Sequence, residues 1–266
     1  MRERVLQELL RIERQNNVRI LLAVESGSRA WGFASPDSDY DVRFVYAHER
    51  DWYLSIFEDA AKREGDSPKP QGNVIEEMLP GRLDINGWDL RKSLRLFSKC
   101  NLALNEWLGS PIVYSEAPGF RERFLRMIPH YFNPIGAMHH YRSMADRAIT
   151  EHLTDGQIAI KKLFYVLRPL LACRWIRHTV AQPPTEFEKL TLPAWVTAEE
   201  KAWIASLLEQ KSEAAEAHTV TLDADRATRI RSELDRYESE AGTLPMRRES
   251  NAAGLDEFFR DFVVGL

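Results

Sequence analysis

The sequence predicts an α+β protein in which a mixed sheet flanked by helices is followed by a C-terminal helical domain. Two observations predict this order. Short apolar runs separated by turn residues, which are typical of buried strands, occur before residue 115, whereas helical periodicity dominates after it. We therefore expect a first domain over residues 1–115 and a helical domain over residues 116–266.

Each predicted element follows from its local pattern. Apolar residues at helical spacing indicate amphipathic helices, and short apolar or alternating runs indicate strands. The elements expected before residue 115 are helix 2–16, strand 18–24, helix 29–33, strand 39–46, helix 50–62, strands 74–79 and 82–88, helix 90–107 and a short edge strand 112–114. A loop is expected over residues 65–72. In the second domain the clearest helices are 156–178 and 197–216.

The composition is that of an ordinary globular protein, with 266 residues, 44% of them hydrophobic and 29% charged. The net charge of −4 gives no general attraction to nucleic acids or membrane surfaces. Two cysteines, Cys100 and Cys173, are too few for a disulfide framework, and both fall in predicted helices. No apolar run suggests a signal peptide or a membrane span. We expect a cytoplasmic protein, whose oligomeric state the sequence leaves open.

Two aspartates stand at the start of the predicted strand 39–46. Residues two apart in a strand point to the same face, so Asp39 and Asp41 would present parallel carboxylates. Such a pair repels itself unless a cation neutralises it. Mg²⁺ prefers oxygen ligands from one or two carboxylates together with substrate phosphates. The pair therefore predicts a metal-binding site.

A Gly-Ser corner precedes these aspartates. At the end of a buried strand, Gly27 would let a phosphate approach the backbone closely, and the Ser28 hydroxyl with nearby amides would donate to its oxygens. Arg29 is placed to contact phosphates, although an exposed helix arginine is the more common outcome. Arg43 lies on the same strand face as Asp41, where it would either neutralise phosphate charge or pair with an aspartate. The pattern predicts a phosphate site beside a metal site.

The combination of Gly-Ser with Asp-Tyr-Asp resembles the signature of the DNA polymerase beta-like nucleotidyltransferase superfamily. More narrowly, four segments resemble the RlaP (YcgL-like) family: GSRAWGFASPDSDYDVRFVY, DINGWDLRKSLRL, NLALNEWLGSPIVY and KKLFYVLRPLLACRWI. The resemblance covers most of residues 20–180. It implies a polymerase beta-like fold and the transfer of a nucleoside monophosphate from an NTP, with ATP expected, to an acceptor hydroxyl. It also implies Mg²⁺ or Mn²⁺ as cofactor and pyrophosphate as the leaving group.

The resemblance further implies a third carboxylate on a neighbouring strand. Asp84 fits because it lies within a predicted strand, and Asp89 competes with it. Asp89 immediately precedes a helix, where a capping role would explain it. In the superfamily's two-metal scheme, the Asp-Xaa-Asp pair holds the ion that binds the triphosphate. The third aspartate helps to hold the ion that activates the attacking hydroxyl.

The remaining nucleotide-binding candidates are Ser38, in the turn before Asp39, and three residues of one predicted helix. Lys161, Tyr165 and Arg168 lie at i, i+4 and i+7 and so share a face. The resemblance implies that the helical domain closes over the NTP, which would bring this face to the nucleotide. The alternative is a solvent-facing basic stripe on an amphipathic helix.

The identity of the acceptor rests on the family alone. Its name links it to RNA repair, so an RNA end is the first expectation. A protein or small-molecule acceptor is the alternative within the same chemistry. A nucleotide-binding pseudoenzyme is disfavoured, because the three carboxylates and Gly27-Ser28 are all present.

Overall fold

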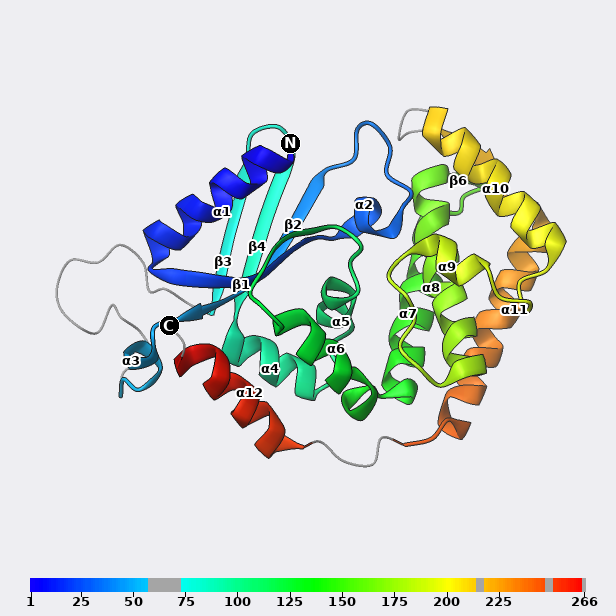
Figure 1. The fold of residues 1–266 in the computed structure, drawn as a ribbon. Helices are drawn as coiled ribbons and strands as arrows, with labels where there is room; N and C mark the ends of the chain where they lie inside the picture. The colour runs from blue at the N-terminus through cyan, green and yellow to red at the C-terminus, as the bar shows by residue number, and fades with distance from the viewer. Residues whose placement is uncertain (57–72, 214–217, 247–250, 265–266) are drawn as a thin grey trace. The chain divides into compact units, whose positions relative to one another are not determined.

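The computed structural model describes residues 1–56, 73–213, 218–246 and 251–264, whose contacts group into two compact units. We call them the sheet unit, from residues 1–27, 39–130 and 249–266, and the helical unit, from residues 28–38 and 131–248. The expected α+β class is confirmed (Figure 1). The contacts divide the chain differently from a single boundary at residue 115, because residues 28–38 group with the helical unit and the C-terminal helix groups with the sheet unit.

The sheet unit contains a mixed five-stranded sheet in the order β3-β4-β2-β1-β5. Its strands are β1 (Val18–Glu25), β2 (Tyr40–His48), β3 (Val74–Leu79), β4 (Leu83–Asp89) and β5 (Val113–Glu116). β2 and β4 run parallel, while the other neighbouring strands pair antiparallel. These strands confirm the expected ones to within two residues at every boundary, and β5 lies at the sheet edge as expected.

The helices of this unit are α1 (Arg2–Asn16), α3 (Arg50–Tyr53), α4 (Leu90–Ser98), α5 (Leu102–Leu108), α6 (Phe120–Tyr131) and α12 (Ala252–Val264). α6 ends one residue into the helical unit. α12 packs against α4 although the two are far apart in the sequence (Figure 1). Residues 57–62 of the expected helix 50–62 and the whole expected loop 65–72 lie outside the described residues.

Alternating burial gives the sheet a core face and an opposite face. The apolar side of α1 packs with Val42 and Phe44 of β2 and with Leu83 and Ile85 of β4. Along β4, buried residues alternate with partly exposed ones. Because side chains in a strand alternate between the two faces, the partly exposed residues Asp41, Arg43 and Asp84 share the face opposite this core.

The expected helix 90–107 is wrong as a single element. The chain breaks between α4 and α5, where Cys100 has a left-handed backbone (φ +59°). The Asn101 side chain then caps α5 by accepting a hydrogen bond from the Leu104 amide at 2.9 Å. Cys100 is therefore not in a helix, whereas Cys173 is.

The helical unit is built around two long helices, α7 (Pro134–His152) and α8 (Ile160–Thr179), which pack together. Its other elements are β6 (Gln157–Ala159), α9 (Phe187–Thr191), α10 (Ala198–Glu213), β7 (Thr219–Thr221), α11 (Ala224–Glu240) and the 3₁₀-helix η2 (Ala241–Thr243). The expected helix 156–178 starts later, at Ile160, because β6 pairs with β7. No helix in the described part of the chain is long and apolar enough to cross a membrane.

Residues 28–38 group with the helical unit, and Phe33 makes several of the contacts. Its ring stacks on Phe164 of α8 at 4.9 Å and meets Phe187 of α9 edge-on at 5.4 Å. The buried Lys211 of α10 donates a hydrogen bond to the Phe33 carbonyl at 2.6 Å. The short helix α2 (Gly27–Trp31) begins with the last residue of the sheet unit's first segment and continues into this anchored segment.

His48, at the end of β2, lies in an aromatic cluster of the sheet unit. Its ring stacks on Trp52 with centroids 3.8 Å apart and planes 11° apart. Its backbone N–H donates to the Tyr53 hydroxyl at 3.1 Å. Burial lowers the pKa of His48 to about 4, because the charged imidazolium would lose its hydration.

This lowered pKa predicts a loss of stability in mild acid. In the unfolded chain His48 takes up a proton near its ordinary pKa of about 6.5, whereas in the folded chain it does so only near about 4. Its contribution to the free energy of unfolding is therefore fully present above about pH 6.5 and is lost as the pH falls toward 4. We expect His48 to account for a loss of about 2 kcal/mol in unfolding free energy between about pH 7 and pH 5. His48→Phe keeps the aromatic stacking and should reduce that loss in urea unfolding. An identical pH dependence in both proteins would contradict the assignment.

Candidate active site

Two carboxylates and one guanidinium form the centre of the site. Asp41 of β2 and Asp84 of β4 lie directly opposite each other in the parallel register. Nη2 of Arg43 lies 3.2 Å from Asp41 Oδ1 and 2.7 Å from Asp84 Oδ2. The three side chains keep between 18% and 28% of their surface exposed, so solutes can reach them. Arg43 therefore bridges the two aspartates, which is the ion-pair role considered for it.

The Arg43 side chain is held in this position by backbone groups as well. Nη1 donates to the Val42 carbonyl at 3.1 Å and to the Asp84 carbonyl at 3.2 Å. A guanidinium has five donors in a rigid fork, so it can satisfy both carboxylates and both carbonyls at once. The arrangement links β2 and β4 on the sheet face opposite the core.

The Gly27 backbone lies beside the Asp41 carboxylate. A Cβ placed on Gly27 would lie only 2.1 Å from Asp41 Oδ2, and the glycine has a left-handed backbone (φ +59°). The Ser26 amide also donates to the Asp41 carbonyl at 2.8 Å. In the structure the close approach at this corner is made to the Asp41 carboxylate, and the phosphate approach expected at Gly27 stays a prediction. Any side chain at residue 27 would displace this carboxylate.

Glu25 is a residue that the sequence interpretation missed. It ends β1 with no exposed surface, and one carboxylate oxygen accepts the Asp41 backbone N–H at 2.8 Å. The other oxygen accepts a hydrogen bond from the Tyr114 hydroxyl, and the Ser110 hydroxyl donates to the Glu25 carbonyl at 2.6 Å. Glu25 thus joins β1, β2 and β5 behind the Gly-Ser corner. The available signal was an acidic residue at the end of a buried apolar run, which must find donors when it is buried.

Asp39 precedes β2 by one residue and is exposed. The strand was expected to include it, but β2 begins at Tyr40, so strand alternation alone does not place its carboxylate beside that of Asp41. The position of Asp39 as a third member of the site stays a prediction.

Arg29 and Ser38 hold the turn that leads toward β2. Nη2 of Arg29 donates to the Ser38 carbonyl at 2.8 Å, and the Ser35 amide donates to the buried Ser38 hydroxyl at 3.0 Å. Ser28 is also buried, at the start of α2. These contacts are structural, and the nucleotide contacts expected of the three residues remain predictions.

Asp89 occupies a different environment from Asp84. It is fully buried and caps α4 by accepting the Arg91 and Lys92 amides at 2.9 and 3.2 Å. It also accepts a hydrogen bond from the Tyr53 hydroxyl at 2.5 Å. Burial raises the pKa of its carboxyl group. Of the two competing aspartates, Asp84 is therefore the one that lies beside Asp41, whereas Asp89 faces the interior.

Asp41 and Asp84 offer at most two protein oxygen ligands to a divalent cation. Across the described residues, no three His, Cys, Asp or Glu side chains are grouped closely enough to form a complete metal site. Mg²⁺ commonly takes one or two carboxylates and completes its coordination with water and substrate phosphates. The adjacent Asp41 and Asp84 fit that requirement, and Arg43 now supplies the positive charge between them.

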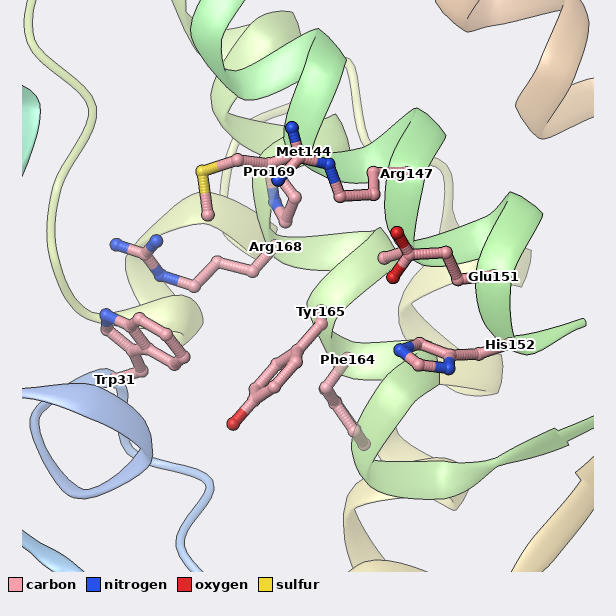
Figure 2. A pocket seen from close by; sticks show the side chains of 10 residues that line it. Trp31, Met144, Arg147, Glu151, His152, Phe164, Tyr165, Arg168 and Pro169 are labelled. Carbon is pink, nitrogen blue, oxygen red and sulfur yellow. The ribbon is translucent and has the colours of Figure 1, made fainter.

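The three candidates on α8 have different surroundings. Arg168 is only 3% exposed, and its guanidinium lies 4.4 Å from the centre of the Trp31 ring. Tyr165 meets Trp31 edge-on at 5.9 Å. Both residues line a pocket of the helical unit with Trp31, whereas Lys161 is partly buried and is not among the lining residues (Figure 2). The alternative of a solvent-facing basic stripe therefore does not hold at Arg168, which is buried.

The buried contacts of Glu25 predict a measurable stability loss. Glu25→Gln retains one acceptor oxygen, so the Asp41 amide and the Tyr114 hydroxyl cannot both keep their partners. We expect urea unfolding to show a loss of about 1–3 kcal/mol, because a buried donor is left unsatisfied. Tyr114→Phe leaves one oxygen of the buried Glu25 carboxylate without its hydroxyl donor, so this variant should lose stability as well. A Glu25→Gln protein as stable as wild type would contradict this role.

Comparison with known proteins identifies the family. The model of the RlaP family, described as the RNA repair pathway DNA polymerase beta family, matches residues 1–261. The uncharacterized protein YcgL of Bacillus subtilis (strain 168) is 46% identical over 211 residues, which cover 79% of this chain and 76% of YcgL. A nucleotidyltransferase-like protein from Exiguobacterium sibiricum 255-15 aligns with 98% of this chain and 80% of its own, at 10% identity and a TM-score of 0.30, which is too weak to support an inference. The resemblance seen in the sequence is confirmed, and the chain belongs to the RlaP family.

Proposed function

We propose that this protein transfers a nucleoside monophosphate from an NTP, with ATP the first choice, to a hydroxyl group at an RNA end, and releases pyrophosphate. The observation that supports this most strongly is the Asp41–Asp84 pair on adjacent parallel strands, next to the Gly27 corner. Membership in a polymerase beta family of an RNA repair pathway supports the same reaction class. The RNA acceptor rests on the family description alone.

In this proposal Asp41 and Asp84 hold the divalent cation, together with Asp39 from the residues just before β2. A bound Mg²⁺ or Mn²⁺ would supply Lewis-acid stabilisation of the negative charge on the phosphate oxygens. Asp84 is the proposed acceptor of the proton from the attacking hydroxyl. The bond from the α-phosphorus to pyrophosphate breaks as the bond to the acceptor oxygen forms, in line with it.

The surrounding residues prepare the carboxylates for this role. Arg43 offsets one of the two negative charges of the pair in the structure, and its guanidinium can turn toward phosphate oxygens once another cation takes its place. Gly27 leaves the space that the Asp41 carboxylate occupies, and Ser28 is the proposed hydroxyl donor to a phosphate. Glu25 holds the Asp41 backbone from behind. The expected closure of the helical residues over the nucleotide stays a prediction.

The test is transfer of label from α-³²P NTPs to short RNAs in the presence of Mg²⁺. Asp41→Asn and Asp84→Asn keep the side-chain size and remove the charge, so we expect transfer to fall by at least about 100-fold. The matched control is Asp51→Asn, in the same unit, whose side chain is 85% exposed. It should transfer as wild type does.

The same assay separates the alternatives. Label found on protein and never on RNA would overturn the RNA acceptor and support nucleotidylation of a protein. Binding of NTP without any transfer would support the pseudoenzyme. Transfer that is unchanged in both Asp41→Asn and Asp84→Asn would refute the proposed metal site itself.

A further inference from the structure

The helical unit contains a pocket of about 360 Å³ formed by α2, α7 and α8. This volume lies in the range of roughly 300–1,000 Å³ that is typical of small-molecule sites. Trp31 contributes from α2, Arg147 and Glu151 from α7, and Tyr165 and Arg168 from α8. Figure 2 shows these side chains turned toward a common space. The pocket lies within one unit, so it does not depend on the placement of the other.

One side of the pocket is a rigid aromatic surface. The Trp31 and Tyr165 rings meet edge-on at 5.9 Å, and the Arg168 guanidinium covers Trp31 at 4.4 Å. Beneath them Phe164 has no exposed surface and stacks on Phe33 at 4.9 Å. Because these rings are fixed by their own packing, they offer a preformed site for a flat ring.

The opposite side carries exposed charges of both signs. Arg147 and Glu151 lie at i and i+4 on α7, and in Figure 2 Glu151 lies across the pocket from Trp31. In the part of the chain that the structure describes, neither side chain forms an ion pair with the other or with another residue. The order of arginine before glutamate is the less favourable one for a helical pair. Both groups are therefore open to a ligand.

The chemistry of the lining selects one class of ligand. A nucleobase would stack on the aromatic surface, a carboxylate such as Glu151 accepts from base amino groups, and an arginine such as Arg147 binds phosphate oxygens. Two arginines and one carboxylate give the lining a small positive charge, which suits one phosphate group. With a single acidic side chain, the pocket lacks the carboxylate pair that would accompany a metal-bound triphosphate.

We propose that this pocket binds a single nucleotide unit, a nucleobase joined to one phosphate, as a site separate from the Asp41–Asp84 site. Two sources carry this chemistry, a free nucleoside monophosphate and the terminal nucleotide of an RNA strand. The assignment of the RNA terminus as the transfer acceptor rests on the proposed function, whereas binding to the pocket does not.

The experiment is calorimetric titration of the full-length protein in EDTA, so that no step depends on a metal. The probes are the four nucleoside monophosphates, the matching nucleosides, and hexaribonucleotides with and without a terminal phosphate. Arg147→Ala should weaken phosphate-bearing probes about tenfold and leave the nucleosides unchanged, since it removes a charged hydrogen bond. Trp31→Leu should weaken all binding probes about tenfold, through loss of base stacking.

The matched control is Arg231→Ala, which removes an exposed arginine of α11 that does not line the pocket. It should bind every probe as wild type does. Arg147 is on the surface, so its variant remains informative even if Trp31→Leu fails to fold, as melting curves would show. Tighter binding of the phosphorylated hexamers than of the monophosphates identifies the RNA end as the source, and the reverse identifies the free nucleotide.

The proposal is overturned if no probe binds, or if Arg147→Ala and Arg231→Ala bind all probes equally well. It is also overturned if Arg147→Ala and Trp31→Leu impair only the binding of Mg·ATP in a parallel titration with Mg²⁺. Failure of nucleotide binding at the pocket can be distinguished from failure of the transfer reaction. Probe binding without label transfer would leave the pocket standing and remove the proposed function, and transfer without probe binding would do the opposite.

Discussion

The interaction on which the candidate site depends is the bridge that Arg43 makes between Asp41 and Asp84. Neighbouring strands lie about 4.8 Å apart, so two carboxylates opposite each other in register repel strongly unless a positive charge lies between them. Arg43 supplies that charge from the same face of the sheet. A protein that needed only a stable sheet would gain little from this arrangement. The arrangement keeps two carboxylates together and accessible, which is what the proposed cation site requires.

The rest of the sheet unit is consistent with this requirement. Glu25 holds the Asp41 backbone from the buried side, and Gly27 leaves no side chain where the Asp41 carboxylate lies. Asp89, the other acidic residue of β4, is turned inward and used to cap a helix. The chain passes from the sheet unit to the helical unit directly after Gly27, so the same short helix begins beside Asp41 and ends at Trp31, which lines the pocket of the helical unit.

Much of this could be predicted from the sequence, for identifiable physical reasons. Apolar runs located the strands. The family resemblance implied a third carboxylate, and Asp84 was favoured over Asp89 because it lies within a predicted strand, whereas helix capping explained Asp89. Part of what failed depends on contacts that are distant in the sequence. The pairing of residues 157–159 with residues 219–221 is not visible in local periodicity, nor is the packing of Phe33 that carries residues 28–38 into the helical unit. The break at Cys100 had a local signal in Asn101, a helix-capping residue, but the helical periodicity continued across it. The buried role of Glu25 had a local signal in its position at the end of an apolar run, but the residue was interpreted as part of a turn.

The central claim, that Asp41 and Asp84 share a divalent cation that carries the nucleotide, is tested most directly by electron paramagnetic resonance of Mn²⁺. The signal of free Mn²⁺ is followed as protein is added, with and without a non-hydrolysable NTP analogue. If the two aspartates share the cation, wild type removes Mn²⁺ from solution beyond what the analogue alone binds, and substituting either aspartate by asparagine abolishes this extra binding. Equal Mn²⁺ binding by wild type and both variants would contradict it.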